Sequence, residues 1–73
     1  NLDTNHHVNN AQFISLAGEC LPKNFTVHRM RAEYKQQAHL SDVLHPLRAE
    51  TENGCFISLN DEKGQPYVVV EFQ

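Results

Sequence analysis

The residues best suited to chemistry lie near the start of the chain, where a carboxylate, a carboxamide and an imidazole alternate. Asp3, Asn5 and His7 are spaced two residues apart, so in an extended segment their side chains would point to one side. A carboxylate can serve as base or nucleophile, and an imidazole moves protons near neutral pH. A carboxamide can orient water or a carbonyl group. The three side chains together are suited to transferring an acyl group to water.

A helix predicted directly after this segment would complete such a site. Residues 8–21 carry a broad apolar stripe, and Pro22 ends the pattern. The free amides and the dipole at a helix start favour negative charge, so main-chain amides around Val8 and Asn9 would hold a developing oxyanion. Gly18 predicts a close approach to a sheet. Asp and Asn before a helix are also common caps, so capping remains an alternative to catalysis.

The remainder of the chain predicts antiparallel strands. Met30, Ala32 and Tyr34 alternate with charged residues, which indicates one dry and one wet face. We expect a hairpin turn at residues 39–42 and a second turn at 53–54. The predicted strands are 25–38, 43–51, 55–59 and 67–72. The fold class is therefore α+β, with one central helix wrapped by an antiparallel sheet of about four strands.

Composition excludes several classes of function. Nine acidic residues against six basic ones leave no footprint for nucleic acid, and a basic row at Arg29, Arg31 and Lys35 is diluted by Glu33. No stretch approaches the roughly 18 apolar residues of a membrane span. No secretory signal is visible, and two cysteines form no disulfide framework. We therefore expect a cytoplasmic protein with free thiols.

The five histidines do not form a metal-binding pattern. His6 and His7 are adjacent, and no pair has the spacing of a helical metal site. We expect no metal and no cofactor. The chain opens at Asn1 without Met and is short for a stable core. It reads as an incomplete domain, residues 1–73, with a catalytic-type loop at 1–7, a helix at 8–21 and strands at 25–73.

One family resembles this chain in two segments. Residues Leu2–Asn10 read LDTNHHVNN, which resembles the catalytic signature of acyl-acyl-carrier-protein thioesterases, proteins of the hot-dog fold. Residues Glu33–Ala38 read EYKQQA, where plant members carry EYRREC. The similarity covers roughly two-thirds of the chain and weakens after Thr51. It implies a partial, C-terminal hot-dog unit of the bacterial type.

The resemblance assigns the family's catalytic residues to positions of this sequence. Its Asp, Asn and His fall on Asp3, Asn5 and His7, and the plant family's later Glu falls on Gln37. Gln holds water by hydrogen bonds but cannot accept its proton, so the base must be Asp3 or His7. An ordinary polar strand residue is the alternative for Gln37. The family's Cys falls on Ala38, which argues against a thiol nucleophile.

The implied function is hydrolysis of fatty acyl-acyl-carrier-protein to free fatty acid and carrier protein, as part of fatty acid biosynthesis. The implied partners are the acyl carrier protein and a second hot-dog unit, either upstream in the same chain or another copy. The acyl tail would lie between helix and sheet or between two units. An acyl-CoA thioesterase of the same fold and a non-catalytic acyl-binding or assembly unit are the alternatives. We expect the isolated fragment to hydrolyse little.

Overall fold

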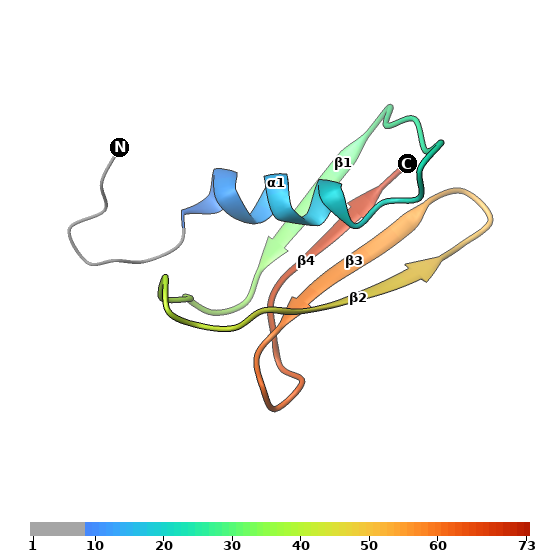
Figure 1. Ribbon diagram of the computed structural model, residues 1–73. Coiled ribbons are helices and arrows are strands. Elements are labelled where there is room, and N and C mark those ends of the chain that lie inside the picture. The colour runs from blue at the N-terminus through green and yellow to red at the C-terminus, as the bar shows by residue number, and fades with distance from the viewer. Residues whose placement is uncertain (1–8) are drawn as a thin grey trace.

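One helix lies across one face of a four-stranded antiparallel sheet (Figure 1). The computed structural model describes residues 9–73. The strand order is β1-β4-β3-β2. This confirms the predicted α+β class and is the arrangement expected of a partial hot-dog domain. The elements are α1 (Asn10–Glu19), β1 (Met30–Tyr34), β2 (His45–Glu50), β3 (Cys55–Asn60) and β4 (Pro66–Phe72).

The core forms where α1 packs on the two central strands. On β3 and β4 the residues facing the helix are fully buried, among them Ile57, Val68 and Val70. The helix contributes Phe13 and Ala17, which are also buried. Burying a large aliphatic or aromatic side chain contributes about 1.5–3 kcal/mol, so this cluster positions α1, and with it the start of the helix, over the sheet.

The helix is shorter than the predicted 8–21 at its C-terminal end, because Cys20 already lies in a turn. Arg48 of β2 donates from Nη1 to the Cys20 carbonyl oxygen at 3.3 Å, and its positive charge suits the negative end of the helix dipole. The close approach predicted at Gly18 is wrong. A Cβ atom built there meets no described atom within 4 Å.

The connection between β1 and β2 differs from the prediction. Residues 39–42 do form a turn, in which the Asp42 N–H donates to the His39 carbonyl oxygen at 2.9 Å. The turn does not close a hairpin, because β1 and β2 lie at opposite edges of the sheet. The apolar strand β4 pairs with β1 on one side and β3 on the other. The segment after β1 therefore crosses from one edge of the sheet to the other. β1 itself is shorter than the predicted strand 25–38.

The other face of the sheet is more exposed than the face under α1. Leu47 pairs with Ser58, and Ala49 pairs with Phe56, so these residues lie on the side away from the helix. Leu47 is 65% exposed and Phe56 36%. Within residues 9–73, no helix is long and apolar enough to cross a membrane.

Candidate active site

The proposed catalytic trio lies outside the described residues. Asp3, Asn5 and His7, together with Val8, precede the part of the chain that the structure describes. The described part of the candidate site consists of the first turn of α1, the segment between β1 and β2, and the side chains that join them.

The start of α1 is closed by a reciprocal capping box. Asn9 accepts a hydrogen bond on Oδ1 from the Gln12 N–H at 2.9 Å, and the Asn9 N–H donates to Gln12 Oε1 at 3.0 Å. Gln at the third helical position is a known partner in such a box. The Asn9 amide thus already has an acceptor. The N–H groups of Asn10 and Ala11 have none among residues 9–73.

Gln37 lies in the segment after β1 rather than in a strand, and it is exposed. Its side chain makes no hydrogen bond to a described residue, whereas both of its neighbours are fixed. Gln36 donates from Nε2 to Asp61 Oδ2 at 3.1 Å and also approaches the carbonyl oxygens of Gln65 and Pro66. Ala38 is completely buried in the core cluster. A fixed main chain thus presents a free carboxamide, which is suited to hydrogen-bonding a water molecule or a carbonyl group.

Tyr67 joins this segment to the helix. Its ring stacks on Phe13 of α1 with centroids 6.2 Å apart and an interplanar angle of 21°. Its hydroxyl donates to Asp42 Oδ2 at 3.2 Å. Tyr67 is 6% exposed, and burial raises the pKa of its phenol above the ordinary 10.0, with the Asp42 charge adding to the effect. The phenol therefore stays protonated and acts as a donor at neutral pH.

Asp42 is the acceptor at the other end of that hydrogen bond. The same Oδ2 atom accepts the His39 main-chain N–H at 2.9 Å, and His39 Nδ1 lies 3.8 Å away. The His39 N–H holds the pKa of Asp42 below its ordinary 3.8, with burial opposing and the Tyr67 hydroxyl supporting this shift. Asp42 is therefore ionised at neutral pH, and the hydrogen bonds it accepts are charge-assisted.

An apolar groove runs between the helix and the β2 side of the sheet. Its volume is about 290 Å³, close to the lower end of the roughly 300–1,000 Å³ of known ligand pockets. It lies where an acyl tail between helix and sheet is expected. The lining residues are Leu16, Glu19, Cys20, Leu44, Pro46 and Leu59.

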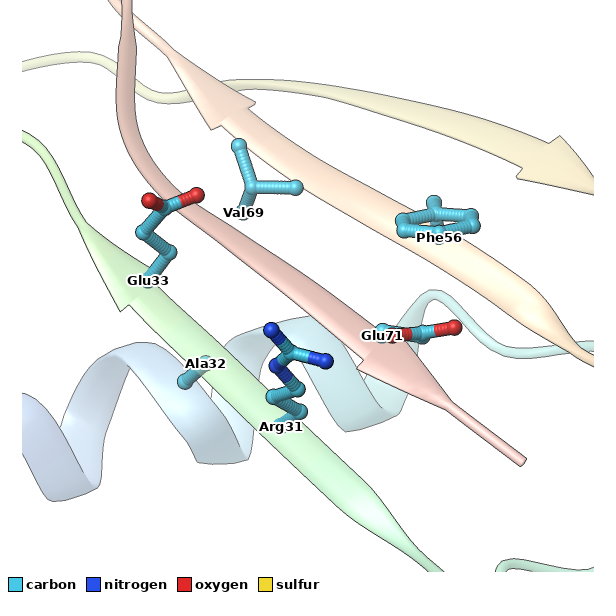
Figure 2. Close-up of a pocket in the computed structure, with 6 residues that line it drawn as sticks. All are labelled: Arg31, Ala32, Glu33, Phe56, Val69 and Glu71. Carbon is cyan, nitrogen blue, oxygen red and sulfur yellow. The ribbon is translucent and has the colours of Figure 1, made fainter.

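A second hollow, of about 400 Å³, lies on the opposite face of the sheet. Figure 2 shows Phe56 and Val69 in it beside the charged side chains of Arg31, Glu33 and Glu71, with the helix behind the sheet. This hollow is separated from the helix by the sheet and is rimmed by charge. It is less suited to an alkyl chain than the apolar groove.

The two cysteines and the possible metal ligands do not form a second reactive site within residues 9–73. Cys20 and Cys55 are free thiols. Burial raises the pKa of Cys55 above its ordinary 9.0, with the Glu50 charge adding, so this thiol stays protonated and unreactive at neutral pH. Among residues 9–73, no three His, Cys, Asp or Glu side chains are grouped to hold a metal ion.

Sequence reasoning missed Tyr67 and Asp42. Tyr67 opens a strand of valines, which marks it as a core residue, and Asp42 reads as an ordinary turn residue. Only the arrangement in space brings the two side chains together, because 25 residues separate them in the chain.

A comparison with models of protein families identifies the family of this chain. The family model described as Acyl-ACP thioesterase C-terminal domain matches residues 1–72. A search of curated proteins and a search of solved structures each return no match. The matched region spans the polar segment of residues 1–7, the helix and all four strands, so the resemblance in two segments extends over the whole sheet. The chain belongs to the acyl-ACP thioesterase C-terminal domain family.

Proposed function

We propose that the protein containing this chain hydrolyses fatty acyl-acyl-carrier-protein to free fatty acid and carrier protein. The observation that carries this proposal is the family match over residues 1–72, which includes the Asp3, Asn5 and His7 motif. The apolar groove beside α1 supports it, because a fatty acyl chain requires an apolar site of that kind. The free thiols support a cytoplasmic location, since such thiols are typical of reducing compartments.

The proposed chemistry is transfer of the acyl group from sulfur to water. Asp3 either activates the water or attacks the thioester carbonyl carbon itself, and in the second case water then hydrolyses the acyl-enzyme. The carbon–sulfur bond breaks, His7 supplies the proton to the leaving thiolate, and Asn5 orients the reacting groups. Main-chain amides around Val8 and Asn9 hold the oxyanion.

The capping box occupies one of the main-chain amides proposed to hold the oxyanion. The Asn9 N–H is bound to Gln12 Oε1, so an oxyanion at that amide would compete with the Gln12 carboxamide. The neighbouring amides at Asn10 and Ala11, which lack an acceptor within residues 9–73, carry the positive end of the helix dipole. We propose that they add to the field that favours negative charge at this point.

Gln37 supplies a hydrogen bond rather than a base in this scheme. Its carboxamide is exposed on a segment whose neighbours are fixed, which suits holding a water or the carbonyl group. Because a carboxamide cannot accept the proton of that water, the proton goes to Asp3 or His7.

A second hot-dog unit is the proposed structural partner. Large apolar side chains stay exposed along β2 and the segment before it, with Leu40 at 57%, Val43 at 64% and Leu47 at 65%. Apolar surface and open sheet edges of this kind are usually covered. The unit would be upstream in the same polypeptide or a second copy.

Turnover with two substrates tests the proposal. The full-length protein is incubated with a fatty acyl-acyl-carrier-protein and with the matching acyl-CoA, and released fatty acid and free thiol are both measured. We expect release from the carrier protein with a higher kcat/KM than from CoA. A higher value for CoA would favour the acyl-CoA thioesterase, and no release from either would favour a non-catalytic acyl-binding unit.

A further inference from the structure

The segment that carries Gln37 is held at both ends by one residue. The Tyr67 carbonyl oxygen accepts the N–H of Lys35 at 2.8 Å and that of Gln36 at 3.4 Å. The Tyr67 hydroxyl donates to Asp42 at the far end of the same segment. The main-chain carbonyl group of Tyr67 therefore binds the start of residues 35–42, and its side-chain hydroxyl binds the end.

At the end of the segment, His39 and Asp42 also form hydrogen bonds with each other. Asp42 accepts the His39 N–H on the oxygen that also accepts the Tyr67 hydroxyl, and its own N–H donates to the His39 carbonyl oxygen. Because the shared acceptor is a charged carboxylate, both hydrogen bonds that Asp42 Oδ2 accepts are charge-assisted. Loss of the phenol hydroxyl would remove the hydrogen bond that joins Asp42 of this turn to Tyr67 of β4.

The same residue also contacts the helix near its start. Phe13, on which the Tyr67 ring stacks, is 2% exposed, and its N–H bonds to the Asn9 carbonyl oxygen in the first turn. A continuous path of contacts thus runs from the cap of α1 through Phe13 and Tyr67 to Asp42. It joins the two parts of the chain that carry the proposed site, the helix start and the Gln37 segment.

We propose that Tyr67 and Asp42 are positioning residues, which hold the Gln37 carboxamide in register with the start of α1. The proposal rests on the proposed thioesterase function. Neither residue is assigned contact with the reacting atoms. Their effect is on geometry, and a displacement of about 1 Å in a catalytic group can cost about a hundredfold in rate.

Steady-state kinetics of the full-length protein test this proposal. Tyr67→Phe keeps the ring and its stacking on Phe13 but removes the hydroxyl. We expect kcat on fatty acyl-acyl-carrier-protein to fall about tenfold with KM little changed, since the apolar groove is untouched. Asp42→Ala should cost a similar factor, and the double variant should cost no more than either single one, because both remove the same link.

Tyr34→Phe is the matched control. The Tyr34 ring also lies near Phe13, with centroids 6.4 Å apart, but its hydroxyl makes no hydrogen bond to a residue of the described range. This variant should keep the wild-type kcat. An unchanged kcat in Tyr67→Phe, or losses that multiply in the double variant, would overturn the positioning role.

Amide hydrogen exchange separates this proposal from the proposed function. In Tyr67→Phe the hydrogen-bonded amides of His39 and Asp42 should exchange faster than in wild type, while those of β3 stay protected. If wild-type protein releases no fatty acid, the thioesterase function fails, and the exchange rates still decide whether Tyr67 holds the segment. Equal exchange at His39 and Asp42 in both proteins would show that the Tyr67 hydroxyl does not hold this segment.

Discussion

Asn9 and Gln12 cap the helix reciprocally, each side chain accepting the main-chain N–H of the other residue. The pair closes the first turn of α1. It also assigns the cap of α1 to Asn9, while the roles of Asp3, Asn5 and His7 stay predictions. Asn9 acts as the cap, so the preceding Asp3, Asn5 and His7 are not needed for the cap at Asn9.

Removing this cap should destabilise the fold. Asn9→Ala deletes the acceptor for the Gln12 N–H, and loss of an N-cap typically costs about 1 kcal/mol. The free energy of unfolding, from urea denaturation followed by circular dichroism, should fall by about that amount. Asn10→Ala is the control, because its side chain makes no hydrogen bond within the described range. Equal losses in the two variants would contradict the assignment.

Two glycines should respond in opposite directions to the same substitution. A Cβ atom at Gly54 would collide with the Phe72 carbonyl oxygen, which is main chain and cannot move aside cheaply. Gly54→Ala should therefore lower the melting temperature. Gly18 lies in α1 with open space around it, so Gly18→Ala should raise stability by up to about 1 kcal/mol through helix propensity. Thermal unfolding of both variants checks this, and a destabilised Gly18→Ala would show that another group covers that position.

Acid should remove the stabilisation that Asp61 provides. Hydrogen bonds from the Gln65 N–H and then from the Gln36 side chain hold the pKa of Asp61 below its ordinary 3.8, against a smaller opposing effect of burial. A lowered folded-state pKa contributes stability above the unfolded value, and this is lost as pH falls through the folded value. Wild type should thus exceed Asp61→Asn in stability at pH 7, and the difference should shrink as the pH is lowered to 2, below the ordinary pKa of 3.8.

Urea denaturation at the two pH values measures that difference. Glu62→Gln, at an exposed neighbouring position, is the control and should differ little from wild type at either pH. A gap between wild type and Asp61→Asn that stays constant down to pH 2 would mean that the Asp61 charge does not stabilise the turn.

Sequence patterns were sufficient for the elements but not for their order. The apolar stripe predicts α1, and the turn at Asn53–Gly54 predicts the β2–β3 hairpin, as observed. Alternation in residues 25–38 identifies the side of β1 that faces the helix, but the predicted dry face is wrong in part, because Met30 and Tyr34 are 45% and 43% exposed. The alternation also does not say which strand lies beside β1. The neighbours are set by burial of the valines of β4, which needs a strand on each side. The predicted hairpin at residues 39–42 failed for that reason.

For the candidate site, too, local patterns predict some residues and leave others out. Residue types and spacing predict a trio at Asp3, Asn5 and His7 from local chain geometry, and this stays a prediction. Tyr67 and Asp42 are far apart in sequence and carry ordinary core and turn signals. Their hydrogen bond depends on the crossing of residues 35–44 over the sheet, which no local pattern encodes.

A carboxylate at position 37 should accelerate hydrolysis. Gln37→Glu places a proton acceptor on the fixed segment where the resemblance expects one, and general base catalysis contributes about 10²–10⁴-fold. Because Asp3 or His7 already serves as base, we expect a smaller gain, of about tenfold in kcat. Ser41→Glu adds the same charge to the same segment at another exposed position and should give no gain. Equal gains in the two variants would point to charge alone rather than to position.

The most direct test of the central claim is the rate of fatty acid release by full-length wild type and Asp3→Asn. The substitution keeps the size of the side chain and removes its charge. We predict that wild type releases fatty acid from acyl-acyl-carrier-protein and that Asp3→Asn lowers kcat by about 10²–10⁴-fold, with circular dichroism unchanged. His6→Ala, beside the trio but without an assigned role, should keep the wild-type rate. An Asp3→Asn protein that turns over as fast as wild type would contradict hydrolysis at this motif.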